Sequence, residues 1–173
     1  DLAVIHVSTV EGKPRRYVSL FFQKPDGFGA MPDQTFTAMP SAGAICFADV
    51  HPAPGVEILS LTGEGVWYQA LRERAYSLEP GLLLFERTFF DRPQPDALPV
   101  WNGVADLDGN GRPDLVLPVR DGFRVYSQEG AGTFPKVLSL AATPERVVEN
   151  REGVFLQLTH SLPAVHVADF DGD

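Results

Sequence analysis

The sequence predicts an all-β fold that is assembled from repeated units. Three observations carry this prediction: many short apolar or β-branched runs, clusters of Gly, Pro, Asp and Asn between them, and an acidic motif that recurs along the chain. Few segments show the periodicity of an amphipathic helix. With 44% apolar and 21% charged residues, the composition is that of a folded domain and not of a disordered chain.

The strand candidates are distributed over the whole chain. Each is a run of apolar, aromatic or β-branched residues that is shorter than an ordinary helix and bounded by turn-forming residues, which is typical of β-strands. The runs occupy residues 17–22, 65–68, 82–85, 115–119, 123–126 and 153–158.

The acidic motif is clearest in residues 106–114, which read D-L-D-G-N-G-R-P-D. Oxygen-bearing side chains stand at loop positions 1, 3, 5 and 9, and a backbone carbonyl is available at position 7. Calcium takes about six to eight oxygen ligands, and alternate residues of a tight turn can direct oxygens at one point. The segment therefore predicts a Ca²⁺ site whose ligands are Asp106, Asp108, Asn110, the carbonyl of Arg112, and Asp114.

Two other interpretations of this segment are possible from its residues. An EF-hand loop also begins D-x-D-x-N-G, but it needs a glutamate at position 12 and a helix on each side. Position 12 is Leu117, and the apolar run 115–119 favours a strand, so the EF-hand is rejected. An ordinary turn is the second alternative, because Asp, Asn and Gly favour turns without any metal. Four correctly phased oxygen side chains favour the metal site.

The motif recurs at both ends of the sequence. Residues 167–173 match residues 104–110, which predicts Asp169, Asp171 and Asp173 as the ligands at positions 1, 3 and 5 of another loop. At the other end, Asp1 aligns with Asp114 and is expected at position 9.

A degenerate copy of the motif occupies residues 49–57. Asp49 and Glu57 keep positions 1 and 9, but His51 and Ala53 replace the oxygen side chains at positions 3 and 5. Pro54 stands where the chain needs a turning glycine. We therefore expect this loop to hold no metal.

The spacing of the four copies predicts one duplicated unit. Position 9 recurs at residues 1, 57 and 114, in steps of 56 and 57 residues, and position 1 recurs at residues 49, 106 and 169, in steps of 57 and 63 residues. Strand candidates lie between the successive copies. This pattern is typical of a β-propeller with about four antiparallel strands in each blade. We expect a single propeller segment over residues 1–173, with approximate blades at 1–56, 57–113 and 114–173. Because rings of this kind have about 4–8 blades, three blades would form part of a ring or be completed by another copy.

Residues 106–115 carry the pattern D-x-D-G-N-G-x-x-D-L without departure, and the chain resembles the FG-GAP/VCBS repeat family. These are calcium-binding β-propellers that include blades of integrin α-subunit heads. Aromatic hairpins at residues 22–29 and 126–134 are similar to those that follow the family's loops. The resemblance covers all three units, strongly in the third and weakly in the second. It implies a Ca²⁺-stabilised propeller.

Several function classes are disfavoured by the composition. The net charge is −9 and no run of Lys or Arg exceeds Arg15-Arg16, which argues against nucleic acid. No apolar stretch is long enough for a transmembrane helix. The chain has no H-E-x-x-H, G-x-S-x-G or paired-cysteine motif, so we predict no catalytic residues and no enzyme activity. The single cysteine, Cys46, is predicted to be a buried strand residue.

Three functions fit these expectations. The favoured one is a non-catalytic binding, adhesion or scaffold module for a protein or glycan ligand. The alternatives are part of a propeller enzyme that acts on polysaccharide, and a structural subunit whose self-association completes the ring. Weak calcium sites suit extracellular modules, so an extracellular, cell-surface or periplasmic location is expected. The aromatic residues to be tested as ligand contacts, or otherwise as packing between blades, are Trp67, Tyr68, Phe89, Phe90 and Trp101.

Overall fold

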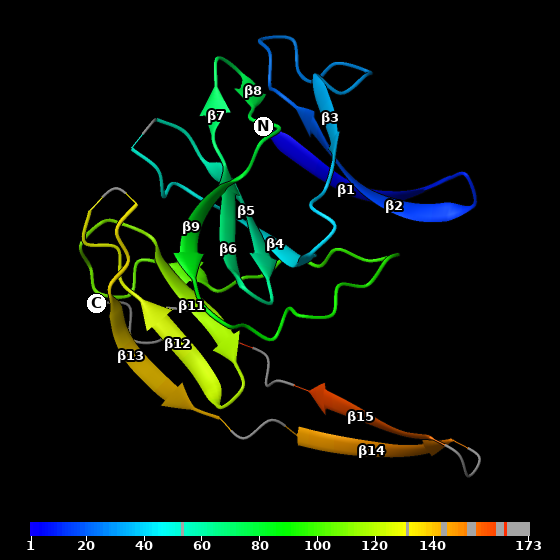
Figure 1. Cartoon of the computed structure of the whole chain (residues 1–173). Coiled ribbons are helices and arrows are strands. Elements are labelled where there is room, and N and C mark those ends of the chain that lie inside the picture. Colours follow the sequence, from blue (N-terminus) through cyan, green and yellow to red (C-terminus); the bar gives the residue numbers. More distant parts are fainter. Residues whose placement is uncertain (53, 131, 143–144, 152–154, 162–164, 166–173) are drawn as a thin grey trace. The chain divides into compact units, whose positions relative to one another are not determined.

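The computed structural model of the protein describes all residues except 53, 131, 143–144, 152–154, 162–164 and 166–173 (Figure 1). Over the described residues the protein is all-β and contains no helix, which confirms the predicted class. The chain divides into two compact units, Asp1–Trp101 and Asn102–Asp173.

The first unit contains two larger antiparallel sheets and a small hairpin. The three-stranded sheet has the order β1-β2-β3 and comprises β1 (Leu2–Val10), β2 (Lys13–Phe21) and β3 (Gln34–Thr37). The four-stranded sheet comprises, in spatial order, β4 (Ala42–Ala48), β5 (Glu57–Thr62), β6 (Gly65–Gln69) and β9 (Gly81–Phe85). Between β6 and β9 the chain forms the short hairpin of β7 (Leu71–Arg72) and β8 (Ala75–Tyr76).

The second unit contains another four-stranded antiparallel sheet, followed by a hairpin. The sheet comprises, in order, β10 (Val104–Ala105), β11 (Asp114–Val119), β12 (Gly122–Tyr126) and β13 (Lys136–Ala141). The hairpin pairs β14 (Glu145–Arg151) with β15 (Phe155–Ser161). All six strand candidates of the sequence coincide with or overlap observed strands. Sheets of three or four antiparallel strands do not by themselves define a propeller.

The two four-stranded sheets share local geometry beside their acidic loops. In each, the loop joins the first two strands, so the expected unit limits at 56/57 and 113/114 fall inside a sheet and not between sheets. Gly65 and Gly122 begin the third strand of their respective sheets. A Cβ at Gly122 would lie 2.0 Å from the carbonyl oxygen of Leu140, and one at Gly65 would lie 2.3 Å from that of Leu84. Glycine therefore permits the same close approach between strands in both sheets.

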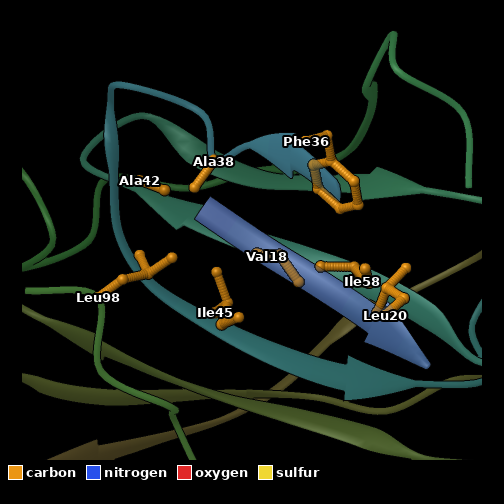
Figure 2. Packing of buried hydrophobic residues seen from close by; sticks show 8 residues of the cluster. All are labelled: Val18, Leu20, Phe36, Ala38, Ala42, Ile45, Ile58 and Leu98. Carbon is orange, nitrogen blue, oxygen red and sulfur yellow. The ribbon is translucent and has the colours of Figure 1, made fainter. Parts of the chain in front are cut away.

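The core of the first unit lies between its two larger sheets. Val18 and Leu20 of β2 pack with Ile45 of β4 and Ile58 of β5 (Figure 2). The other buried members of this cluster are Phe36, Ala38, Ala42 and Leu98. Burial of a large aliphatic side chain contributes about 1.5–3 kcal/mol, so this cluster is a principal stabilising contact between the sheets. Cys46 is buried in β4, as predicted, and burial raises the pKa of its thiol to about 12.

A buried arginine adds polar contacts beside this core. Arg16 of β2 is only 6% exposed, and its guanidinium donates to backbone carbonyls on two other segments. Nη1 donates to the oxygens of Ala42 at 2.6 Å and Ala97 at 3.3 Å. Nη2 donates to those of Met39 at 3.1 Å and Pro40 at 2.8 Å. Arg16 thus fastens β2 to the start of β4 and to the segment around residue 97.

Candidate metal centre

The predicted metal loop connects β10 to β11 in the second unit. It brings together three of the expected ligands, because carboxylate oxygens of Asp106, Asp108 and Asp114 all lie within 4.8 Å of one another. Asp106 and Asp108 are exposed, whereas Asp114 is 1% exposed at the start of β11. The donor set consists of hard oxygen atoms without nitrogen or sulfur, which fits Ca²⁺ better than a transition metal.

Two glycines give the loop its tight turn. Gly109 and Gly111 have φ angles of +74° and +79°, in the left-handed region that favours glycine. The turn directs two backbone N–H groups at the first carboxylate: Asn110 donates to Asp106 Oδ1 at 3.1 Å, and Gly111 donates to its Oδ2 at 2.8 Å. The glycines at positions 4 and 6 therefore place the Asp106 side chain over the loop.

Asp108 is oriented by hydrogen bonds from two sides. The hydroxyl of Ser127 donates to Asp108 Oδ2, and the backbone N–H of Asn110 donates to Oδ1 at 3.1 Å. The hydrogen bond from Ser127 is the main reason that the pKa of Asp108 lies below its usual value, and the Asn110 hydrogen bonds also lower it. Both contacts favour the ionised carboxylate, which is the form that binds a cation.

Asn110 and Arg112 fasten the loop to the segment that follows β12. Asn110 Oδ1 accepts from the N–H of Arg112 at 2.8 Å, while Nδ2 donates to the carbonyl of Gln128 at 3.2 Å. The guanidinium of Arg112 donates to the carbonyl of Glu129 at 2.6 Å. These contacts hold the loop in place, and a role for Asn110 and the Arg112 carbonyl as metal ligands stays a prediction.

Asp114 has a structural function that the sequence did not suggest. Its Oδ2 accepts the N–H of Leu107 at 2.8 Å, and its Oδ1 accepts the N–H of Gln128 at 2.9 Å. One buried carboxylate therefore joins the start of its own loop to the segment beyond β12. A buried N–H without an acceptor is costly, so these bonds stabilise the loop whether or not a metal is present.

The first unit contains a matching contact. The N–H of Gln23 donates to Asp1 Oδ1 at 2.9 Å, the same distance as in the Gln128–Asp114 contact. The register is also the same in both sheets. Leu2, next to Asp1, pairs with Phe21, and Gln23 lies two residues beyond it. Leu115, next to Asp114, pairs with Tyr126, and Gln128 lies two residues beyond it. The alignment of Asp1 with Asp114 thus has a counterpart in hydrogen bonding. Because the donors are backbone groups, only the shared glutamines could have indicated this from the sequence.

The acidic segments 49–57 and 169–173 differ from loop 106–114 in what the structure shows of them. Among the described residues, the group of acidic side chains near enough to hold a metal is that of Asp106, Asp108 and Asp114, and the segment 49–57 does not contribute one. The expected ligands Asp169, Asp171 and Asp173 lie outside the described residues.

The aromatic candidates are half-buried in the first unit. Phe90 and Trp101 form an edge-to-face pair with ring centroids 5.5 Å apart, and Tyr68 stacks on His51 at 4.9 Å. These contacts indicate that part of each ring surface is used in packing.

Comparison of the chain with family models, with curated proteins and with solved structures finds no match. Within the part of the chain that the structure describes, no helix is long and apolar enough to span a membrane.

Proposed function

We propose that the chain is a Ca²⁺-stabilised β-propeller segment that serves as a non-catalytic binding or scaffold module, with a protein or glycan ligand. The observation that carries the proposal is the close grouping of the Asp106, Asp108 and Asp114 carboxylates on one glycine-turned loop. A module that uses Ca²⁺ in this way suits an extracellular, cell-surface or periplasmic setting, where calcium is abundant.

The role proposed for the ion is structural: it would stabilise the folded loop and the strands that the loop joins. Three carboxylates within 4.8 Å of one another repel when all are ionised, and a divalent cation replaces that repulsion with attraction. Because the loop joins β10 to β11 and is fastened to the segment after β12, the ion would stabilise three strands together. A cation that binds the folded state only stabilises it, by about 2.7 kcal/mol at a concentration of 100 times its Kd.

Support for a propeller comes from the similarity of the sheets. The two four-stranded sheets have the same order of strands, with an acidic loop between the first and second. In both, a glycine that begins the third strand allows close approach to the fourth, and 57 positions separate Gly65 from Gly122. The core between the two sheets of the first unit is the type of contact by which adjacent blades would pack.

The proposal predicts that Asp106→Asn weakens calcium binding with little effect on the metal-free protein. Asp106 is exposed, and its carboxylate accepts backbone N–H groups for which the amide oxygen of Asn can partly substitute as acceptor. We expect a loss in affinity on the order of tenfold or more, equivalent to about 1.4 kcal/mol, in calorimetric titration with CaCl₂. Melting in excess chelator should be nearly unchanged.

Asp96→Asn is the matched control, because it removes an equal charge from an exposed position outside the metal loop. It should leave both the affinity and the melting temperature unchanged. If the native protein neither binds calcium nor melts at a higher temperature in its presence, the calcium-stabilised function is wrong.

A further inference from the structure

The loop at residues 49–57 contains a buried carboxyl group in an unusual environment. Glu57, at the start of β5, is 0% exposed. Its Oε2 accepts the backbone N–H groups of Val50 at 2.8 Å and His51 at 3.1 Å. Its Oε1 is buried and has no hydrogen-bond partner within the described structure. One oxygen of Glu57 therefore closes the loop between β4 and β5 through hydrogen bonds. The other oxygen is buried without a hydrogen bond that would offset its loss of hydration.

Comparison with Asp114 shows what is different about this site. Both carboxyl groups occupy position 9 of their loops, and both accept the N–H of the residue at position 2, which is Val50 or Leu107. Asp114 uses its second oxygen to accept the N–H of Gln128 and faces two further carboxylates that suit a cation. Glu57 has neither arrangement, and no salt bridge to it occurs among the described residues.

The titratable groups facing Glu57 do not supply a fixed positive charge. Asp49 disfavours ionisation of Glu57 by repulsion, whereas His51 favours it when charged. From β8, Tyr76 faces the same region, and its hydroxyl donates to the carbonyl of Val56 at 2.6 Å. An ionised carboxylate that is buried without a cation is costly, and such a group normally becomes neutral. Consistent with this, burial is the main cause that raises the pKa of Glu57, despite the two N–H contacts that lower it.

We infer that loop 49–57 is a pH-responsive element whose closed conformation requires a protonated Glu57. The equivalent position of loop 106–114 is occupied by Asp114, which is grouped with two other carboxylates that suit a cation. The proton belongs on Oε1, because Oε2 already accepts two hydrogen bonds. In the neutral acid the buried charge is absent, while the contacts of Oε2 with the loop backbone are kept. Closure of loop 49–57, in the first unit, is thus sensitive to pH and independent of calcium. Closure of loop 106–114, in the second unit, is the one proposed to depend on calcium.

The direction of the pH effect follows from the raised pKa. The folded protein holds the proton of Glu57 more tightly than the unfolded chain does, so the contribution to stability is complete below the pKa of an unfolded glutamate. It is lost as the pH rises through the higher pKa of the folded state. Between these two values the folding equilibrium constant decreases about tenfold for each pH unit. Ionisation should also weaken closure of the loop.

Glu57→Gln tests the inference, because glutamine keeps the shape and an oxygen acceptor but cannot ionise. Unfolding of the full chain would be followed in chelator over a pH series that begins below the ordinary range of glutamate. The native protein should lose stability relative to the variant by up to about tenfold in folding equilibrium constant per pH unit, until Glu57 is fully ionised. Glu64→Gln is the control, at an exposed position in the turn between β5 and β6. Its stability should change with pH in the same way as that of the native protein.

A second measurement on the native chain decides the matter even if the variant does not fold. Carbon NMR would follow the side-chain carboxyl of Glu57 directly, with that of exposed Glu64 as the internal reference. The inference requires the Glu57 signal to titrate at higher pH than Glu64. It also requires the Val50 and His51 amide protons to lose protection over the same range, relative to the intrinsic exchange rate at each pH. Titration of both carboxyl groups together, or equal pH slopes for the native protein and Glu57→Gln, would overturn it. The use of chelator keeps this result separate from any calcium effect.

Discussion

Replacement of Arg16 by methionine is expected to destabilise the first unit by about 3 kcal/mol or more. The guanidinium is nearly buried and donates to the carbonyl oxygens of Met39, Pro40, Ala42 and Ala97. Methionine preserves much of the aliphatic volume but removes all four hydrogen bonds, of which the one to Ala42 is buried and the others are partly buried. Hydrogen bonds to charged groups contribute about 1.5–3 kcal/mol each. Burial also lowers the pKa of Arg16, which shows that the protein holds this cation at a cost in solvation.

Arg15→Met is the matched control, since Arg15 is the preceding residue of β2 and is exposed. Its effect on chemical denaturation should be within about 0.5 kcal/mol of zero. The loss of stability caused by Arg16→Lys should lie between those of Arg15→Met and Arg16→Met. An ammonium keeps the charge but lacks the planar guanidinium that reaches several carbonyls at once. Equal unfolding curves for Arg15→Met and Arg16→Met would show that the carbonyl contacts contribute little.

The sequence predicted the strands well because strand formation has a local signature. Residues 115–119 form an apolar run, and all of β11 is buried, as expected of a strand covered on both faces. Which sheets face each other had no such signature. Arg16 contacts the carbonyl of residue 97, and the side-chain amide of Gln34 exchanges two hydrogen bonds with the backbone of Tyr76, at 2.9 and 2.7 Å. Contacts over such separations depend on the register of whole sheets.

The close grouping of three carboxylates could be predicted for the same local reason. Asp106, Asp108 and Asp114 lie within nine consecutive residues, so their spacing alone indicates that they converge. Ser127 and the N–H of Gln128 were missed, because they come from a segment beyond the next two strands and a backbone N–H leaves no trace in the side-chain pattern. Glu57 illustrates a different limit. The motif predicted its position in the loop, but its chemistry depends on burial, which only the packed structure reveals.

Removal of the Asp114 carboxylate is expected to destabilise the second unit in two separable ways. In chelator, Asp114→Ala should lower the free energy of unfolding by about 2 kcal/mol or more, because the buried N–H of Gln128 and the partly buried N–H of Leu107 lose their acceptor. With calcium present, the proposed calcium site requires a larger loss, since the variant would also lack the stabilisation proposed for bound calcium, about 2.7 kcal/mol at 100 times Kd.

Comparison with Asp106→Asn separates the two contributions. Asp106 belongs to the same carboxylate group but is exposed, so its replacement should reduce only the calcium-dependent part. Asp114→Ala should reduce both parts, and equal unfolding of Asp114→Ala and the native protein in chelator would contradict the structural role. A deficit that is the same with and without calcium would leave Asp114 as a purely structural residue. The buried carboxylate would then fasten the loop to the segment after β12, and the ion would have to be held by other oxygens.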